Sequence, residues 1–382
     1  MRCAIVEAVL LAAGEGSRLR PFTADKPKPM IRAANKPILQ YAVESLVANG
    51  VRDITIVVGY QRERVQSHFG DGRKHGARIS YAFQSALTGT ARALTTASRP
   101  AEPFLALGGD NVVDAELIAA ALSAPKREPA LVVHRSRTPT RYGVATLDGD
   151  RLLALEEKPA HARSEWVSTG VYVLTPELYD EAAELARAGE GGLPDVLERA
   201  LARGMRVHVV RSESLWSDAV YPWDLLRVHA DLLRAHPPPP LDAPGVHAEA
   251  PVRVGDECIV GPGTTLAAGT CIGHNVVIGP NCVLENCVVY DDVQIAAGSI
   301  LRNTIVGAGT RIGARFTALS GRCEVQLTDG WHHLEDFGAI IGEDCRVGGA
   351  STLLPGSIIG NHVQVAPGRT LHANVPDRSH VL

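Results

Sequence analysis

The 382-residue sequence is poor in aromatic residues, which make up 5% of it, and it has neither a C-x-x-C pair nor a block of Lys or Arg. Its seven cysteines are scattered and odd in number, so neither a disulfide framework nor a zinc site is indicated, and we interpret them as small buried hydrophobes. A net charge of −4 without a basic block gives no electrostatic footprint for a polyanion. We therefore expect no nucleic-acid partner and no membrane partner.

Long hydrophobic runs are also missing. The first apolar run, residues 4–13, contains Glu7, is too short to span a bilayer and ends in a Gly-rich turn rather than a cleavage site. We expect a cytoplasmic protein. What is present is 45% hydrophobic residues, mainly aliphatic, beside 21% charged residues, which predicts a folded globular chain long enough for two or three domains.

Residues 1–236 alternate strand-length apolar runs with helix-like stretches, which is typical of an α/β domain with a mostly parallel sheet. Four consecutive prolines at 237–240 cannot continue a helix and predict a Pro-rich linker over 237–249. The expected strands are 6–11, 53–58, 77–83, 104–107, 130–133, 144–147, 170–174 and 205–210, and the clearest helices are 38–49, 193–203 and 222–236.

Residues 250–382 follow a repeat of period six. An aliphatic residue at every sixth position predicts short straight segments separated by corners, three of which close one triangular coil. Glycine often follows the aliphatic residue, where a missing Cβ lets the corner turn tightly. We predict a parallel β-helix of hexapeptide type that resembles the left-handed β-helices, interrupted between Ala318 and Ala339. The repeating positions are Val254, Val260, Leu266, Ile272, Ile278, Leu284, Val289, Ile295, Leu301, Val306, Ile312, Ile341, Val347, Leu353, Ile359, Val365 and Leu371.

The segment LAAGEGSRLRPFTADKPKPM, residues 11–30, carries the chemistry of the first half. Its Gly14-Glu15-Gly16 turn follows a strand, and bare backbone amides there can approach a phosphate closely. Arg18 and Lys28 follow, and cationic groups can neutralise charge on a reacting triphosphate. The spacing fits neither a Walker P-loop nor a G-x-G-x-x-G dinucleotide site.

This segment resembles the signature of the sugar-1-phosphate nucleotidylyltransferases, L-A-A-G-x-G-x-R-L-x-P-x-T-x-x-x-P-K, with every fixed position occupied. The resemblance implies a Rossmann-like nucleotidyltransferase domain that joins UTP or dTTP to a sugar 1-phosphate by in-line displacement, with release of pyrophosphate and no protein nucleophile. It implies that Arg18 and Lys28 are catalytic. The nucleotide contacts it implies in this segment are Leu11, Ala12, Ala13, Gly14 and Gly16.

The same resemblance extends along the first half. Gln84, followed by Gly89 and Thr90, is similar to the base-reading segment of the family, and a Gln amide offers both a donor and an acceptor to a pyrimidine edge. Asp110 and Asp218 match the aspartates that the family uses for Mg²⁺, which takes few protein ligands and leaves positions to water and phosphate oxygens.

Sugar binding is implied for three short loops. Carboxylates can accept hydrogen bonds from sugar hydroxyls while a lysine faces phosphate. The spacing leaves open whether Glu156 or Glu157 faces the sugar. The sequence does not settle whether the sugar is glucose, N-acetylglucosamine or galactose, although the first two are preferred. The residues are Gly143, Glu156, Glu157, Lys158, Ser168 and Thr169.

The order of the two halves resembles bifunctional enzymes whose β-helix also acetylates glucosamine 1-phosphate from acetyl-CoA. Their His and Tyr fall here on Ala297 and Ile300, neither of which can act as a base, and only His332-His333 in the interruption could replace them. The preferred interpretation is an assembly module, since such β-helices pack as a homotrimer or a dimer of trimers. The third hypothesis is a non-catalytic regulatory or scaffold subunit, which the retained Arg18, Lys28, Asp110 and Asp218 disfavour.

Overall fold

The computed structural model describes residues 5, 7–85, 89–125, 128–189 and 191–382, so Cys3 and the predicted strand residue Val6 lie outside the described residues. The chain forms two compact units. The first comprises Met1–Glu15, Lys26–Met30 and Pro37–Ser217, and the second comprises Gly16–Asp25, Ile31–Lys36 and Asp218–Leu382. The segment 11–30 is therefore divided between the units.

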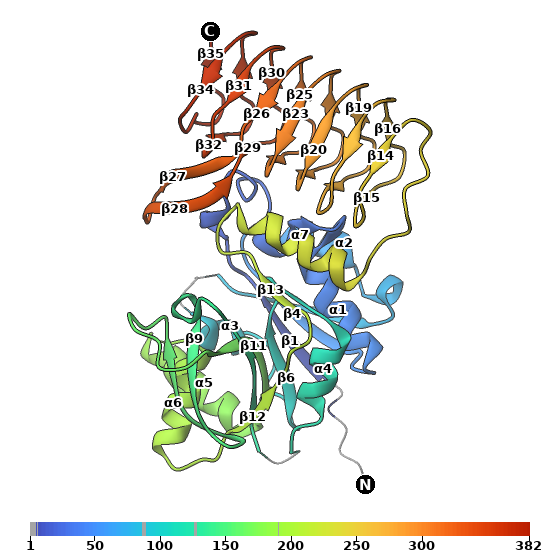
Figure 1. Cartoon of the computed structure of the whole chain (residues 1–382). Helices are drawn as coiled ribbons and strands as arrows, with labels where there is room; N and C mark the ends of the chain where they lie inside the picture. The colour runs from blue at the N-terminus through green and yellow to red at the C-terminus, as the bar shows by residue number, and fades with distance from the viewer. Residues whose placement is uncertain (1–4, 6, 86–88, 126–127, 190) are drawn as a thin grey trace. The chain divides into compact units, whose positions relative to one another are not determined.

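A nine-stranded sheet forms the centre of the first unit (Figure 1). Four neighbouring strands are parallel, β5, β4, β1 and β6, and β11 then runs antiparallel to both β6 and β8. The predicted α/β class is confirmed, although the sheet is mixed. The strands, in sheet order, are β5 Arg78–Phe83, β4 Asp53–Val58, β1 Glu7–Ala12, β6 Phe104–Gly108, β11 Trp166–Leu174, β8 Ala130–Arg135, β12 His208–Arg211, β10 Arg151–Glu157 and β9 Gly143–Asp148.

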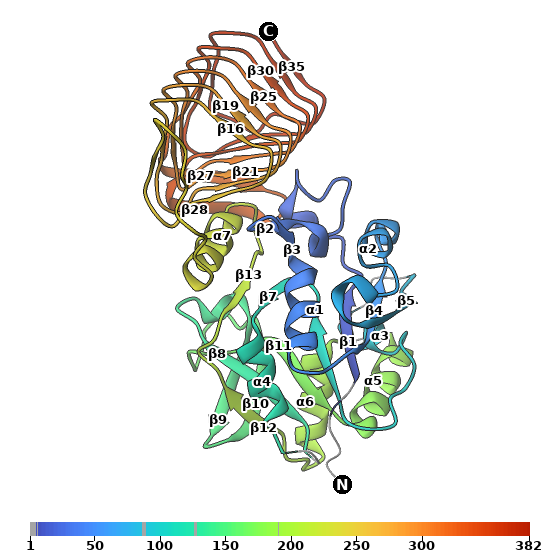
Figure 2. The ribbon, with the colours of Figure 1, turned by 90° about the vertical axis from the view of Figure 1, so that its right-hand side faces the viewer.

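Helices cover both faces of this sheet (Figure 2). One buried cluster joins the sheet to α1 (Ile38–Ala48), α2 (Arg62–Phe69) and α4 (Ala115–Leu122), and a second joins it to α3 (Thr90–Leu94), α5 (Pro176–Ala188) and α6 (Leu193–Ala202). Because both faces of the sheet are buried, its central strands can be nearly continuous apolar runs. The shorter elements are η1 Ser17–Leu19, η2 Lys28–Met30, η3 Arg73–His75, η4 Pro139–Arg141, β2 Arg32–Ala33, β3 Lys36–Pro37, β7 Asn111–Val113 and β13 Trp216–Asp218.

The second unit contains helix α7 (Asp224–Ala235) and three sheets of short parallel strands, which form the triangular coils that Figure 2 shows end-on. The arrangement is that of the predicted left-handed β-helix. The first sheet is β14 His247–Ala248, β17 Thr265–Leu266, β20 Val283–Glu285, β23 Ile300–Arg302, β26 Thr317–Ala318, β31 Thr352–Leu353 and β34 Thr370–Leu371; the second is β15 Arg253–Val254, β18 Cys271–Ile272, β21 Val288–Val289, β24 Ile305–Val306, β29 Ala339–Ile341 and β32 Ser357–Ile359; the third is β16 Ile259–Val260, β19 Val277–Ile278, β22 Gln294–Ile295, β25 Arg311–Ile312, β30 Arg346–Val347, β33 Gln364–Val365 and β35 His380–Val381.

The period-six residues fill the interior of these coils. Leu266, Leu284 and Leu301, for example, are fully buried and stack in register from coil to coil. The corner glycines are required by close stacking, since a Cβ on Gly255 would lie 2.3 Å from the carbonyl oxygen of Gly273 in the next coil. The six described cysteines are free thiols, four of them buried, in agreement with their interpretation as hydrophobes.

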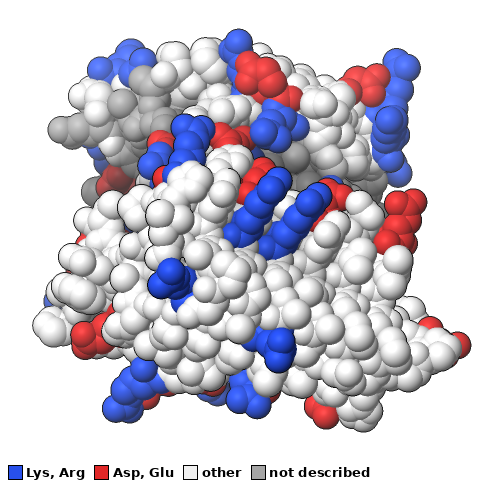
Figure 3. Space-filling model, turned by 90° about the horizontal axis from the view of Figure 1, so that it is seen from above, with Lys and Arg blue, Asp and Glu red and all other residues white. Residues whose placement is uncertain are grey.

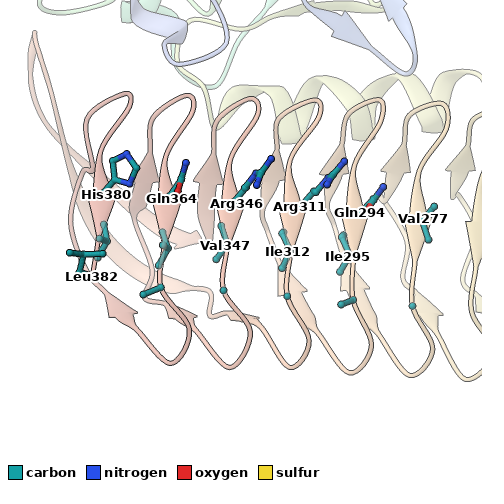
Figure 4. Close-up of a pocket in the computed structure, with 17 residues that line it drawn as sticks. Val277, Gln294, Ile295, Arg311, Ile312, Arg346, Val347, Gln364, His380 and Leu382 are labelled. Atoms are coloured by element: carbon teal, nitrogen blue, oxygen red, sulfur yellow. The ribbon is translucent and has the colours of Figure 1, made fainter.

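The three faces of the β-helix differ in what covers them. On the second sheet even the outward-facing positions, such as Val288 and Ile305, are buried. Helix α7 packs against this sheet at β21, and the segments 16–25 and 31–36 belong to the same unit. The third sheet instead carries exposed polar side chains along successive strands, above a shallow trough of about 650 Å³ (Figure 4). One face of the β-helix is thus committed to packing N-terminal segments of the chain, whereas another is open. The labelled polar side chains of the open face are Gln294, Arg311, Arg346, Gln364 and His380.

The predicted interruption of the repeat is a β-hairpin of β27 (Gly321–Leu327) and β28 (Gly330–Phe337). The coils continue across it, since Ile305 of β24 pairs directly with Ile340 of β29. The hairpin is therefore an insertion at a corner and not a break in the β-helix.

Two further features concern the charges on the surface and the hydropathy of the helices. In Figure 3 the basic and acidic side chains are interspersed over the face that is shown. Within the described part of the chain, no helix is long and apolar enough to cross a membrane.

Candidate active site

The carboxyl ends of β1, β4, β5 and β6 meet at one edge of the first unit's sheet, where α/β folds place their ligands. Backbone hydrogen bonds tie the following residues together: the Gly109 N–H donates to the Leu11 carbonyl (2.9 Å) and the Gln84 N–H to the Val58 carbonyl (2.9 Å). Because the strands are parallel and in register, Gly14, Gln84 and Asp110 all emerge at this edge.

Three glycines shape the edge in different ways. A Cβ on Gly59 would lie 2.8 Å from the Ala13 carbonyl oxygen, and one on Gly109 would lie 2.9 Å from the Ala12 side chain, so these positions require glycine for packing. A Cβ on Gly14 would meet no described atom within 4 Å. Its backbone therefore faces open space, as a turn that approaches a ligand requires.

Lys28 and Asp110 form the charged centre of this edge. The Lys28 Nζ lies 2.8 Å from Asp110 Oδ2, and the side chains are 11% and 40% exposed, so the lysine is largely buried while the carboxylate stays accessible. Burial raises the pKa of Asp110, but Lys28, by charge and hydrogen bond, outweighs it and holds the pKa below its usual value, with a further contribution from Lys158. Asp110 is therefore an ionised carboxylate at neutral pH.

A β-bulge in β11 borders the same site. The register of β11 against β8 shifts between Ser168 and Tyr172, and Gly170 adopts a positive φ of 74° there. The Ser168 hydroxyl accepts the Gly170 N–H (3.1 Å) and lies 3.3 Å from the Tyr172 hydroxyl, whose pKa burial raises to about 12. Bulges re-aim side chains next to active sites, and this one presents Ser168 and a neutral Tyr172.

Glu157 and Lys158 lie at the end of β10, opposite Gly143 of β9. A Cβ on Gly143 would lie 3.1 Å from Glu157 Oε2, so the glycine leaves room for this carboxylate. The Lys158 Nζ lies 3.4 Å from Glu157 Oε1, and the Glu157 charge acts on Tyr172. Glu156 is opposite Val144, and neighbouring residues of a strand point to opposite faces. Of the two carboxylates, Glu157 is therefore the one that lies toward Tyr172.

Two predicted contact residues have their hydroxyls engaged within the protein. The Thr169 hydroxyl, 1% exposed, donates to the Val132 carbonyl (2.8 Å). The Thr90 hydroxyl accepts the Leu193 N–H (2.8 Å) and so joins the start of α3 to the start of α6. These hydroxyls stabilise the local fold, and a ligand contact at either residue stays a prediction.

Gln84 is buried, and its Nε2 lies 3.5 Å from the Gly89 carbonyl. Gly89 has a φ of 102°, and a Cβ there would lie 2.3 Å from the Gly191 carbonyl oxygen, so only glycine fits. The predicted base-reading pair therefore lies together in the first unit.

Two family models match the chain. A family model described as nucleotidyl transferase matches residues 7–235, more than half of the chain. The chain belongs to the nucleotidyl transferase family. A second model, described as the GMPPB C-terminal domain, matches residues 247–323, within the β-helix.

Relatives of the family match both halves of the chain. A glucose-1-phosphate thymidylyltransferase of Streptomyces griseus is 32% identical over 340 residues, covering 85% of this chain and 94% of that protein. The bifunctional protein GlmU of Methanocaldococcus jannaschii is 25% identical over 390 residues, covering 94% and 92%. A mannose-1-phosphate guanylyltransferase of Mycobacterium tuberculosis is 29% identical over 303 residues, covering 78% and 83%. The chain is thus similar to sugar-1-phosphate nucleotidyltransferases that differ in nucleotide and sugar.

One solved structure supports the fold. A crystal structure assigned to a glucose-1-phosphate thymidylyltransferase of Bacillus anthracis superposes with a TM-score of 0.55 at 25% identity, covering 62% of this chain and 97% of that one.

Among the family's signature residues, Gly16 and Arg18 lie in the second unit, as does Asp218, the last residue of β13. The Arg18 Nε lies 3.3 Å from Asp329 Oδ2 of the hairpin, and the Asp218 carbonyl accepts a hydrogen bond from Arg227. The predicted site residues are therefore distributed over both units, and their common role stays a prediction.

Three residues that were not predicted contact predicted site residues, namely Tyr172, Asn111 and Asp329. Asn111 donates to the Thr169 carbonyl (3.2 Å) and so fixes the bulge. Its position directly after the predicted metal ligand Asp110 could have indicated that Asn111 lies near the site. For Asp329 the sequence offers only a position within an interruption of the repeat, because its partner Arg18 is far away along the chain.

Proposed function

We propose that this chain is a sugar-1-phosphate nucleotidylyltransferase that makes a UDP- or dTDP-sugar, with glucose or N-acetylglucosamine as the sugar. The observation that carries the proposal is the Lys28–Asp110 pair, 2.8 Å apart, at the sheet edge where Gly14 faces open space. A partly buried ammonium beside an accessible carboxylate and bare amides is suited to a polyphosphate.

In the proposed reaction, an oxygen of the sugar 1-phosphate attacks the α-phosphorus of the nucleoside triphosphate. A new P–O bond forms as the bond from the α-phosphorus to its bridging oxygen breaks, and that oxygen leaves on pyrophosphate. Lys28 and Arg18 neutralise the charge that develops on the non-bridging and leaving oxygens, while the rest of the site orients the two phosphates. No protein nucleophile is needed.

The donor set fits Mg²⁺. Asp110 supplies a hard, ionised and accessible oxygen, and the family resemblance adds Asp218 as a second carboxylate. Within the described residues no group of three or more His, Cys, Asp or Glu side chains gathers that could hold a metal ion. Mg²⁺ takes few protein ligands and completes its shell with water and phosphate oxygens. When bound, the ion would supply charge neutralisation at the phosphates.

We propose two groups of substrate contacts, one for the base and one for the sugar phosphate. Gln84, beside Gly89, would read a uracil or thymine edge. Glu157 would accept hydrogen bonds from sugar hydroxyls, with Lys158 toward the sugar phosphate. The exposed Glu156 would be a solvated surface charge.

The deciding experiment measures pyrophosphate release by the purified protein with Mg²⁺, each of four nucleoside triphosphates, and several sugar 1-phosphates. We expect turnover with UTP or dTTP and glucose 1-phosphate or N-acetylglucosamine 1-phosphate. Turnover with GTP alone would overturn the pyrimidine assignment. No turnover with any pair would favour the scaffold alternative.

The β-helix is proposed to be an assembly module that forms a homotrimer or a dimer of trimers. Its third sheet, with exposed side chains along its strands, is available for packing between subunits in the isolated chain. Sedimentation equilibrium tests the proposal, and a monomer would contradict it. Acetyl transfer is not proposed, because Ala297 and Ile300 stand where the resemblance expects the His and the Tyr, and neither can act as a base.

A further inference from the structure

The β27–β28 hairpin does not serve coil stacking. Around the insertion β24 pairs with β29, β25 with β30 and β26 with β31, so the β-helix is complete without it. Its strands pair with each other in a sheet of their own. The hairpin packs on the β-helix unit, with Val325 and Phe337 buried, but the pairing of the coils does not account for its tip.

The tip of the hairpin is held by specific contacts within the second unit. His332 packs against Tyr221, with ring centroids 4.4 Å apart, and Tyr221 in turn stacks on Trp223 at 5.1 Å. The Asn374 side chain donates to the Gln326 carbonyl at 2.8 Å. The tip is thus fixed in place.

Asp329, in the turn of this hairpin, gathers three polar partners. Its Oδ2 lies 3.3 Å from Arg18 Nε and accepts the Tyr221 hydroxyl at 3.0 Å, and its Oδ1 lies 3.0 Å from His332 Nε2. Its side chain is 28% exposed. Burial raises the pKa of Asp329, but hydrogen bonds from His332 and Tyr221 outweigh it and hold the pKa below its usual value, so the group is a carboxylate.

The segment that carries Arg18 is itself anchored on the β-helix. The buried ring of Phe22 lies 5.6 Å from that of Tyr290, and the Asn361 side chain donates to the Pro21 carbonyl at 2.9 Å. The Thr23 hydroxyl donates to the Gly16 carbonyl at 2.9 Å, which closes the turn. Backbone anchors of this kind leave the long Arg18 side chain still to be oriented.

We propose that Asp329 is a positioning residue for Arg18, and that the inserted hairpin orients a catalytic arginine of the nucleotidyl transferase domain. This inference rests on the proposed function, in which Arg18 binds the triphosphate. A guanidinium has five N–H donors in a rigid fork. Asp329 pairs with Nε, and no hydrogen bond joins the terminal nitrogens to a described residue, so their N–H groups can donate to phosphate oxygens.

The physical benefit is a smaller entropy loss on binding. A free arginine side chain, 51% exposed here, must be immobilised when it binds a phosphate, whereas one held at Nε is already oriented. The partners of Asp329 also include Tyr221, three residues after the predicted metal ligand Asp218, so one carboxylate ties the hairpin to two segments of the signature.

The test is a double-mutant cycle on pyrophosphate release, with kcat and KM for the triphosphate measured separately. Asp329→Asn should lower kcat/KM for the triphosphate by about 10- to 100-fold, as expected for a misplaced binding group. In an Arg18→Ala background the same change should have almost no further effect, because the residue on which it acts is gone. Asp329→Glu should restore part of the activity.

Glu335→Gln is the matched control, since Glu335 pairs with Arg322 on the same hairpin and is largely exposed. It should leave kcat/KM unchanged. An Asp329→Asn effect that persists fully without Arg18, or wild-type kinetics for Asp329→Asn, would overturn the proposal. If Asp329→Asn does not fold, Tyr221→Phe removes one partner of Asp329 and is placed in the same cycle, where an effect independent of Arg18 again overturns it. Inactive wild-type protein would instead overturn the proposed function.

Discussion

The 11–30 segment has two parts, and each packs in a different unit of the chain. Residues 11–15 and 26–30 belong to the α/β unit, whereas residues 16–25 belong to the unit of the β-helix. In the first part, parallel strands and the Lys28–Asp110 ion pair fix the backbone and the charge. In the second part, aromatic packing and side-chain hydrogen bonds fix it. A contiguous motif is therefore not one structural unit, and the β-helix contributes to the segment that carries Arg18.

Removing the anchor of the second part should have the largest effect. Phe22→Ala deletes a buried ring that packs on Tyr290 and should cost the second unit about 3–5 kcal/mol of unfolding free energy. Urea unfolding monitored by hydrogen exchange of the β-helix would measure this loss. Phe83→Ala, at a side chain 53% exposed in the first unit, is the control and should cost far less. Equal losses would show that residues 16–25 are not anchored through Phe22.

In the first part, Lys28→Ala should reduce kcat by about 100- to 1000-fold, equivalent to about 3–4 kcal/mol, because a cation at the reacting phosphates is lost. Steady-state pyrophosphate release measures this. Lys74→Ala, at an exposed position of η3, should retain the wild-type rate. A Lys28→Ala enzyme with near wild-type kcat would exclude Lys28 from catalysis.

The two units should also differ in their response to mild acid. His229, 1% exposed in α7, has a pKa lowered to about 4 by burial, against 6.5 unfolded. Because the folded state favours the neutral ring, its contribution is present above pH 6.5 and is lost as the pH falls toward 4. The second unit should thereby lose about 3 kcal/mol of unfolding free energy, whereas the depressed pKa of Asp110 matters only at lower pH.

Denaturant midpoints between pH 7 and pH 4 would measure this dependence. His229→Gln should be less stable at pH 7 but should show a shallower slope with pH. His372→Gln, at an exposed position, should keep the wild-type slope. An unchanged slope in His229→Gln would assign the acid sensitivity to other groups.

The smallest effect is expected at Gly14. Its Cβ would meet no described atom within 4 Å, and its φ is not in the left-handed region, so Gly14→Ala should leave the thermal midpoint nearly unchanged. The added methyl group would instead occupy space proposed for the triphosphate and should raise KM by about tenfold, near 1.4 kcal/mol. A lowered midpoint with unchanged KM would mean that Gly14 is there for packing alone.

Much of the fold could be predicted because it depends on local periodicity. Each period-six residue from Val254 to Leu371 lies in a short strand of the β-helix, and the strand predicted at 53–58 matches β4 to the residue. The sequence did not indicate β10, whose apolar and charged residues mix, or the antiparallel course of β11, which depends on the partners that tertiary packing supplies.

Candidate site residues could be predicted where each lies in a recognisable short motif. Arg18, Lys28 and Asp110 each stood out by type and spacing, and the structure brings Lys28 and Asp110 into contact. The pairing of Arg18 with Asp329 could not be foreseen, because it depends on where a hairpin tip meets a segment far away along the chain. Likewise, the register of β9 with β10 was needed to see that Glu157, and not Glu156, lies opposite Gly143.

The continuity of the coils around the β27–β28 hairpin has a consequence for insertions into the β-helix. The chain leaves the β-helix after Ala318 and returns at Ala339, and the return needs Gly338, since a Cβ there would lie 2.0 Å from the Arg302 carbonyl oxygen. The strands on either side keep their coil-to-coil pairing across the insertion, while the hairpin packs on the unit through its buried Val325 and Phe337. This corner therefore shows that a long insertion between two strands can leave the coil register of a β-helix unchanged, so insertion length and coil register are independent here.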